Sequence, residues 1–188
     1  MLERYKRYNE AFPKYPPLVA TDRWVTGVWM IGNNYQNKMG YYGEYPPTYL
    51  KRVMSMFEDI PDGEILHLFS GAVDARGLKY DINPDLESNQ VQGDAHNLSE
   101  FFPPETFQLI LADPPYTEED ALHYGHPMIN RNKVVKECAK VLAPGGYLAW
   151  LDQVLPMYRK DTFELQLTVG IIRSTNHRFR MLCIFKKV

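Results

Sequence analysis

The chain has 188 residues, 45% of them hydrophobic and 13% aromatic, and a formal net charge of −2. This composition excludes a disordered chain, and the length suits a single domain with a sizeable core. The sequence contains no apolar run of about 18 residues, so a membrane-spanning helix is not expected. Because the N-terminus is charged and aromatic, we also expect no signal peptide, no membrane partner and a cytoplasmic location. Cys138 and Cys183 lie among apolar residues without metal-ligand spacing, which predicts core thiols and no metal site.

Positive charge gathers at the two ends of the chain. Residues 1–52 hold eight Lys/Arg against four Asp/Glu, residues 53–150 hold six against sixteen, and residues 151–188 hold seven against three. A polyanionic partner would meet the basic ends. Ordinary variation of a solvated surface explains the same pattern equally well.

Residues 1–43 are predicted to form an N-terminal arm, since neither a helical nor a strand period is clear there. Arg4, Lys6 and Arg7 alternate with tyrosines, and further aromatic residues follow. Basic and aromatic side chains mixed in this way suit base stacking and phosphate contact. The alternative is an arm packed over the sheet by its aromatic side chains, which is favoured for Trp24 and Trp29.

A second segment, residues 44–188, is predicted to form the main domain and to begin with a helix. Pro46 and Pro47 lead into this helix, and Thr48 is its expected N-cap. Apolar residues recur on one face of the helix until Pro61-Asp62-Gly63 ends it in a turn.

Three apolar runs then predict parallel strands, each ending in a turn. Residues 65–69 lead to Gly71, residues 78–84 contain Asp81, and residues 91–95 contain Asp94. Only nine residues separate Gly71 from Asp81, whereas a crossover between parallel strands needs about a dozen or more. We therefore expect no helix longer than about two turns between these strands.

The most informative stretch is Asp113-Pro114-Pro115-Tyr116, directly after the apolar run 109–112. That run is typical of a buried parallel strand, which the two prolines must end. The Asp113 carboxylate then projects at the carboxyl end of a central strand, where open α/β sheets bind ligands. Asp113 and the Pro114 carbonyl can accept hydrogen bonds from an exocyclic amino group, and Tyr116 can stack on the ring that carries it. A strand-ending loop with an incidental aspartate is the alternative.

The remaining residues predict the second half of the sheet. Thr117 begins a short acidic helix, residues 123–132 form a polar loop beside the motif, and residues 133–142 form an amphipathic helix. Pro144-Gly145-Gly146 ends that helix before a strand at 147–151. Two further strands are expected at 165–172 and 179–185, separated by a loop that carries Arg173 and Arg178.

Several of these motifs resemble one enzyme family. Asp113-Pro114-Pro115-Tyr116 resembles the motif of S-adenosylmethionine (SAM)-dependent amino-methyltransferases, chiefly the DNA adenine-N6 and cytosine-N4 enzymes. The ribosomal-RNA guanine-N2 enzymes carry a close relative of this motif. Asp81-Ile82-Asn83-Pro84 and Gly93-Asp94-Ala95 are also similar to the family. Phe69-Ser70-Gly71 resembles its Phe-x-Gly-x-Gly loop, although Val73 stands in place of the second glycine.

The resemblance implies a Rossmann-like α/β domain of the class I SAM-methyltransferase type. Its sheet would be mostly parallel, with about seven strands, a C-terminal antiparallel strand pair and shortened first crossovers. Asp81 would meet the ribose hydroxyls of SAM, and Asp94 its adenine amino group. The full implied set of catalytic residues is Asp113, Pro114, Pro115 and Tyr116, and that of cofactor-binding residues is Phe69, Ser70, Gly71, Asp81, Ile82, Asp94, Ala95 and Pro46.

The resemblance also implies methyl transfer from S-adenosyl-L-methionine to an exocyclic amino group of a nucleic-acid base, with adenine N6 in DNA favoured. DNA is favoured over RNA as the partner. A homodimer or a partner subunit would supply strict sequence specificity, because little of the chain remains for a separate reading domain. Two alternatives stay open: an RNA base amino-methyltransferase, and a catalytically inactive binding protein that kept the fold, which the altered glycine loop allows.

Overall fold

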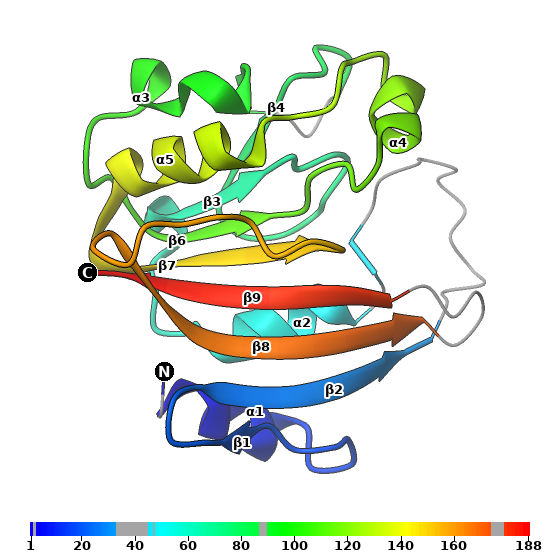
Figure 1. Cartoon of the computed structure of the whole chain (residues 1–188), viewed down its shortest axis with the longest axis vertical. Coiled ribbons are helices and arrows are strands. Elements are labelled where there is room, and N and C mark those ends of the chain that lie inside the picture. Colours follow the sequence, from blue (N-terminus) through cyan, green and yellow to red (C-terminus); the bar gives the residue numbers. More distant parts are fainter. Residues whose placement is uncertain (2, 33–44, 47, 87–89, 174–178) are drawn as a thin grey trace.

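A computed structural model of the chain describes residues 1, 3–32, 45–46, 48–86, 90–173 and 179–188 (Figure 1). Its helices are α1 (Arg4–Ala11), α2 (Tyr49–Ser55), α3 (Leu98–Phe101), α4 (Glu118–His123) and α5 (Arg131–Val141), with short 3-10 turns η1 (Asp62–Glu64) and η2 (Ala95–Asn97). Its strands are β1 (Val19–Ala20), β2 (Val25–Ile31), β3 (Ile65–Leu68), β4 (Leu78–Asp81), β5 (Val91–Gln92), β6 (Phe107–Ala112), β7 (Leu142–Asp152), β8 (Phe163–Arg173) and β9 (Phe179–Lys187).

All strands in the described part of the chain belong to one sheet, in the order β1-β2-β8-β9-β7-β6-β3-β4-β5. β9 lies antiparallel between β7 and β8, and β1 is antiparallel to β2, whereas the other neighbours run parallel. The predicted mostly parallel sheet with a C-terminal antiparallel pair is confirmed. The described residues form nine strands and not about seven, because residues 19–31 add two at one edge.

The N-terminal segment is built into this sheet. β2 pairs with β8 along its whole length, and α1 packs beneath it. Tyr8 and Trp29 are fully buried, with ring centroids 5.0 Å apart. Packing by aromatic side chains is therefore confirmed for Trp29, while Trp24 is 38% exposed. The tyrosines between residues 33 and 44 lie outside the described residues.

Two of the basic residues predicted to meet phosphate are already paired. Arg4 donates to both carboxylate oxygens of Asp59, at 2.6 and 2.9 Å, and Arg7 donates to the same carboxylate. The Arg4 guanidinium also lies over the ring of Phe57, 5.0 Å from its centroid. These arginines therefore fasten α1 to the segment that follows α2.

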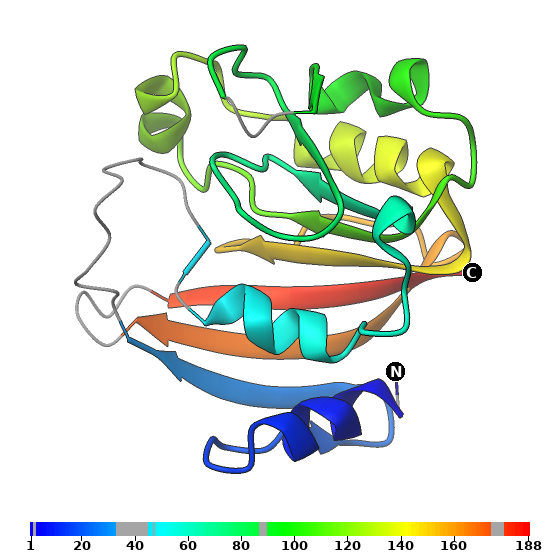
Figure 2. The same ribbon diagram turned by 180° about the vertical axis from the view of Figure 1, so that it is seen from behind.

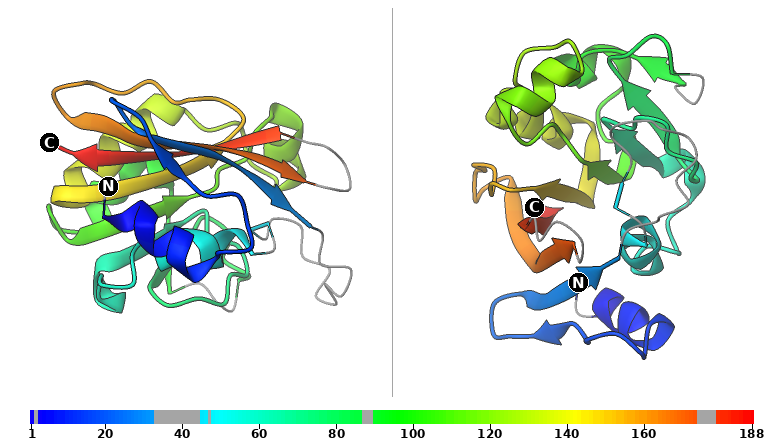
Figure 3. Two further views of the ribbon diagram at one scale, coloured as in Figure 1. Left: turned by 90° about the horizontal axis from the view of Figure 1, so that it is seen from below. Right: turned by 90° about the vertical axis from the view of Figure 1, so that its right-hand side faces the viewer.

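Helices cover both faces of the sheet (Figures 2 and 3). α1 and α2 lie on one face, where Leu109 and Leu111 of β6 point. α5 and α3 lie on the other face, where the alternate residues Ile110 and Ala112 point. A strand buried on both faces has no polar side to show, which explains why residues 109–112 are apolar without alternation.

The first crossover is short, as predicted. Residues 69–77, between β3 and β4, form turns and contain no helix. Arg76 ties this loop down by donating to the carbonyls of Phe57 and Ile60, each at 2.8 Å. The loop thus covers the part of the sheet face that a crossover helix would occupy.

Beneath this loop His67 is completely buried, with its Nε2 2.9 Å from the carbonyl oxygen of Arg76. Burial lowers its pKa to about 4, so the imidazole is neutral at physiological pH. His67 is therefore a structural group of the β3 strand.

Local signals at the helix ends were partly right. Thr117 caps α4 by accepting a hydrogen bond from the Asp120 N–H at 3.1 Å, as predicted. The prediction that Thr48 caps α2 is wrong: its backbone is left-handed, with φ of 65°, and its side chain makes no capping bond. α5 ends at Val141 and β7 starts at once, so Pro144 and Gly145 belong to the beginning of the strand.

Cys138 and Cys183 are buried free thiols, as predicted. Within the described ranges, no helix is both long and apolar enough to cross a membrane. The same residues contain no cluster of three or more side chains suited to hold a metal ion.

Candidate functional site

Four aspartates lie at the carboxyl ends of the parallel strands, along one end of the sheet. Asp81 ends β4, Asp94 follows β5, Asp113 follows β6 and Asp152 ends β7. Since side chains alternate along a strand, Asp113 projects to the same face as Leu111, the face that carries α2. Asp81 projects to that face as well, because its neighbour Tyr80 packs on the opposite one.

Tyr45 links the predicted catalytic and cofactor-binding residues. Burial raises the pKa of its hydroxyl well above the ordinary value, and the negative charges of Asp113 and Asp81 raise it further. The phenol therefore lies within electrostatic reach of both carboxylates. Its ring stacks on Tyr49 with centroids 5.5 Å apart, which fixes it at the beginning of α2.

The Asp113 motif adopts the predicted stop after β6. Tyr116 donates a short hydrogen bond from its hydroxyl to Oδ1 of Asp113. Burial raises the pKa of Asp113 to about 6, while the charge of Arg180 and the Tyr116 bond act in the opposite direction. Pro114 is buried and Pro115 is partly exposed. The carboxylate is ionised at neutral pH but close to its titration range.

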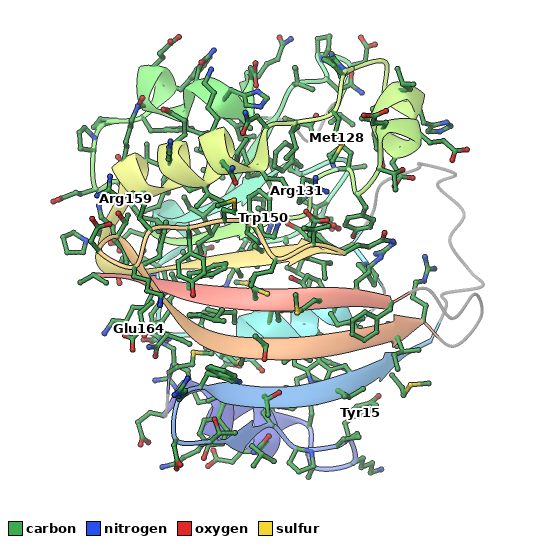
Figure 4. The ribbon with its side chains drawn as sticks, in the orientation of Figure 1. Tyr15, Met128, Arg131, Trp150, Arg159 and Glu164 are labelled. Carbon is green, nitrogen blue, oxygen red and sulfur yellow. The ribbon has the colours of Figure 1, made fainter. Side chains whose placement is uncertain are left out.

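Arg131 and Asp152 support this motif from the other side of the sheet edge. The Asp152 carboxylate is buried and accepts from Arg131 Nε at 2.7 Å, from Arg131 Nη2 at 3.1 Å and from Trp150 Nε1 at 3.2 Å. Arg131 Nη2 also donates to the backbone carbonyl of Tyr116 at 3.0 Å. Figure 4 shows Arg131 and Trp150 side by side in the centre of the molecule. The ion pair thus holds the backbone that carries Tyr116.

The polar loop predicted beside the motif leads into α5. Residues 128–132, which include Arg131, line a surface depression. Figure 4 labels Met128 and Arg131 in this segment. Asn130 caps α5 by accepting a hydrogen bond from the Lys133 N–H at 3.0 Å. The beginning of α5 is therefore fixed close to the motif.

Among the residues predicted to bind the cofactor, Asp81 holds the loop after β3. Its Oδ2 accepts from the Gly71 N–H at 2.9 Å, and its Oδ1 accepts from the Asn83 N–H at 3.0 Å. Phe69 has a φ of 59° and Gly71 a φ of 52°, so the chain turns sharply here in a left-handed conformation that glycine adopts freely and phenylalanine only with strain. Strain of this kind is concentrated at ligand-binding turns.

Two buried hydroxyl groups near this turn have no hydrogen-bond partner among the described residues. They are the Oγ of Ser70, a residue that is 2% exposed, and the Oη of Tyr45. Pro46, the residue after Tyr45, is buried, and its carbonyl accepts from the Tyr49 N–H at 3.0 Å.

Asp94 takes part in a relay to α5. Its Oδ1 accepts from the His96 N–H at 2.9 Å and contacts His96 Nδ1 at 2.6 Å, and His96 Nε2 accepts from the Asn130 N–H at 2.9 Å. Burial acts to raise the pKa of Asp94, but the contacts with His96 act in the opposite direction and the pKa is lowered overall. Ala95 packs into the α5-side core and Ile82 is 37% exposed. Of the predicted cofactor residues, Ala95 therefore offers only its backbone.

No family model and no curated protein matches the sequence. Among solved structures, TrmN from Thermus thermophilus superposes with a TM-score of 0.55 at 17% identity, over 77% of this chain and 49% of that chain. A SAM-dependent methyltransferase from Aquifex aeolicus gives a TM-score of 0.45 at 14% identity, over 76% and 93% of the two chains. SMU.1697c, a methyltransferase from Streptococcus mutans in complex with SAH, gives 0.42 at 13% identity, over 69% and 89%.

At such low identity the similarity concerns the fold alone. The conclusion about the fold rests on the TrmN superposition. The chain spans about half the length of TrmN. Together with the strand order, this similarity confirms the predicted α/β fold of the class I methyltransferase type.

Proposed function

We propose that this protein transfers a methyl group from SAM to an exocyclic amino group of a nucleic-acid base, with adenine N6 in DNA as the favoured acceptor. The observation that carries the proposal is the position of Asp113 and Tyr116. Their side chains are hydrogen-bonded to each other at the carboxyl end of a central strand, on the face that Asp81 also approaches. Methyl transfer requires that the groups that hold the target amine and the groups that hold the cofactor lie on one face, so that the two reactants meet in the right orientation.

The residues around Asp81 fit SAM. The Ser70 and Tyr45 hydroxyl groups have no partner among the described residues and offer hydrogen bonds to a ligand, and the Asp81 carboxylate would accept from the ribose hydroxyls. Asp94 would accept from the adenine amino group. When bound, SAM supplies a methyl group on a positively charged sulfur atom.

The residues of the motif would hold the target. The Asp113 carboxylate and the Pro114 carbonyl accept the two amine hydrogens, and Tyr116 offers a ring face to the base. Holding the amine makes its nitrogen more nucleophilic and points it at the methyl group. The base must be flipped out or single-stranded to reach this position.

The rate of methyl transfer is expected to fall at acidic pH. Burial raises the pKa of Asp113 to about 6, and protonation removes the negative charge that makes this carboxylate a strong acceptor for the amine hydrogen. Below that pH the rate at saturating substrate should drop about tenfold per pH unit. A pH series of initial rates, with SAM affinity measured in parallel, checks this. A rate that stays constant down to about pH 5 would contradict the role given to Asp113.

Replacing Asp81 with alanine is expected to weaken SAM binding by about 1.5–3 kcal/mol, or about 10- to 150-fold, through loss of charge-assisted hydrogen bonds. Isothermal titration calorimetry measures the effect. Asp85→Ala is the matched control, because Asp85 is an exposed acid in the same turn. Equal affinities in both variants would make Asp81 a structural turn residue only.

Two alternatives keep the same fold. An RNA base would suit the same motif, since Asp113 and Tyr116 meet the base and not the sugar. A binding protein without SAM would lack the calorimetric signal altogether. Incubation with tritiated SAM and either DNA or RNA separates these cases. The proposal expects label in DNA, and strict sequence specificity would need a second copy or a partner subunit.

A further inference from the structure

Arg180 reaches the Asp113 motif from a strand that the proposed function does not use. It is the second residue of β9 and pairs with Ile171 of β8. The next residue, Met181, pairs with Asp152 at the end of β7, so Arg180 lies just beyond that end. Its strand neighbour Leu182 packs on the α2 face, and alternation directs Arg180 to the same face as Asp113.

The Arg180 guanidinium lies among the groups assigned to the target. Its carbon Cζ is 4.6 Å from the centroid of the Tyr116 ring. Its positive charge lowers the pKa values of Asp113 and Tyr49, against the larger opposite effect of burial. One face of the Tyr116 ring is therefore covered by a cation, which leaves the other face for a base.

The Nε–H of Arg180 is left without a hydrogen bond. Among the described residues its buried Nε has no partner, and Arg180 forms no ion pair with them. Arg131, by contrast, binds Asp152 through both Nε and Nη2. A buried N–H without a partner is rare in folded proteins and calls for an explanation such as a bound ion or ligand.

The chemistry of the missing partner follows from the guanidinium. Nε–H and one Nη–H point in parallel and match an acceptor with two oxygen atoms, a carboxylate or a phosphate. Asp113 does not fill this place, since its Oδ1 is taken up by Tyr116 and it forms no ion pair with Arg180. Stacking on Tyr116 alone leaves the buried Nε unsatisfied.

We propose that Arg180 is the oxyanion-binding residue of the site around Asp113 and Tyr116, and that it takes a carboxylate or phosphate group of a molecule bound beside Tyr116. The identity of that molecule rests on the proposed function. It is either the methionine carboxylate of SAM or the phosphate of the target nucleotide, which share this chemistry.

The first test does not depend on methyl transfer. Inorganic phosphate should raise the melting temperature of the wild type, and the rise should be absent in Arg180→Met, which keeps an apolar side chain against Tyr116. Arg159→Met is the control, because it also removes one positive charge, from an exposed residue at the opposite end of the sheet (Figure 4). If wild type and Arg180→Met respond equally to phosphate, the proposal is overturned. Arg180→Gln replaces Arg180→Met should the latter not fold.

The second test identifies the source of the oxyanion by calorimetry. Loss of SAM affinity by about tenfold or more in Arg180→Met, with 5′-methylthioadenosine unaffected, identifies the methionine carboxylate. Loss of the preference for deoxyadenosine monophosphate over deoxyadenosine identifies the phosphate. Arg180→Lys should recover part of either loss. Unchanged binding of all four compounds overturns the proposal, whereas a wild type that binds phosphate but neither SAM nor nucleotide refutes only the proposed function.

Discussion

Replacing Asp113 with alanine is expected to lower the rate of methyl transfer at least about 100-fold while leaving SAM affinity nearly unchanged. Under the proposed function Asp113 would hold the target amine, whereas Asp81 and Asp94 are the carboxylates assigned to the cofactor. Single-turnover rates and calorimetry on the same preparations give the two quantities. A variant that methylates as fast as the wild type would refute the assignment.

The same position makes a prediction about stability. The pKa of Asp113 is raised from 3.8 to about 6, chiefly by burial. An acid whose pKa is higher in the folded state destabilises the fold as it ionises, so its cost grows between these two pH values and is complete above them. Asp113→Asn should therefore be more stable than the wild type by up to about 3 kcal/mol near pH 8, with no gain near pH 3.5. Chemical denaturation at both pH values measures this difference.

Replacing Asp152 with alanine is expected to lower the free energy of unfolding by about 3–5 kcal/mol. The Asp152 side chain has no exposed surface and Arg131 only 20%. Its removal leaves the Trp150 N–H without its acceptor and the Arg131 guanidinium with only the Tyr116 carbonyl as a partner. Asp161→Ala is the control, because it breaks a fully exposed pair with Arg159 and should leave the unfolding curve unchanged. If Asp152→Ala lowered the free energy of unfolding as little as this control, the buried ion pair of Asp152 would not stabilise the fold.

Arg131→Lys separates stability from positioning. Lysine can keep the ion pair with Asp152 but offers no planar fork to reach the Tyr116 carbonyl at the same time. The rate of methyl transfer should therefore fall much more than the melting temperature.

The sequence predicted the parts of the fold that local chemistry decides. β6 ends at Ala112 because two prolines cannot continue a ladder, and the short span from Gly71 to Asp81 leaves no room for a helix. The motif at Asp113 was recognisable for the same reason, since its residues are contiguous.

What the sequence did not predict depends on distant partners. Buried and exposed residues do not alternate regularly along β2, and the strand it pairs with, β8, lies far along the chain. Arg131 and Asp152 are 21 residues apart, and neither stands in a distinctive motif. Arg180 follows residues 174–178, outside the described part, and only the sheet brings it to Tyr116.

The most direct test of the account is to incubate the purified protein with methyl-tritiated SAM and single-stranded DNA, then to separate the digested nucleosides. The account predicts label that co-migrates with N6-methyldeoxyadenosine and that disappears in Asp113→Ala. Absence of label from every nucleoside of DNA with the wild-type protein, in a sample that binds SAM, would contradict it.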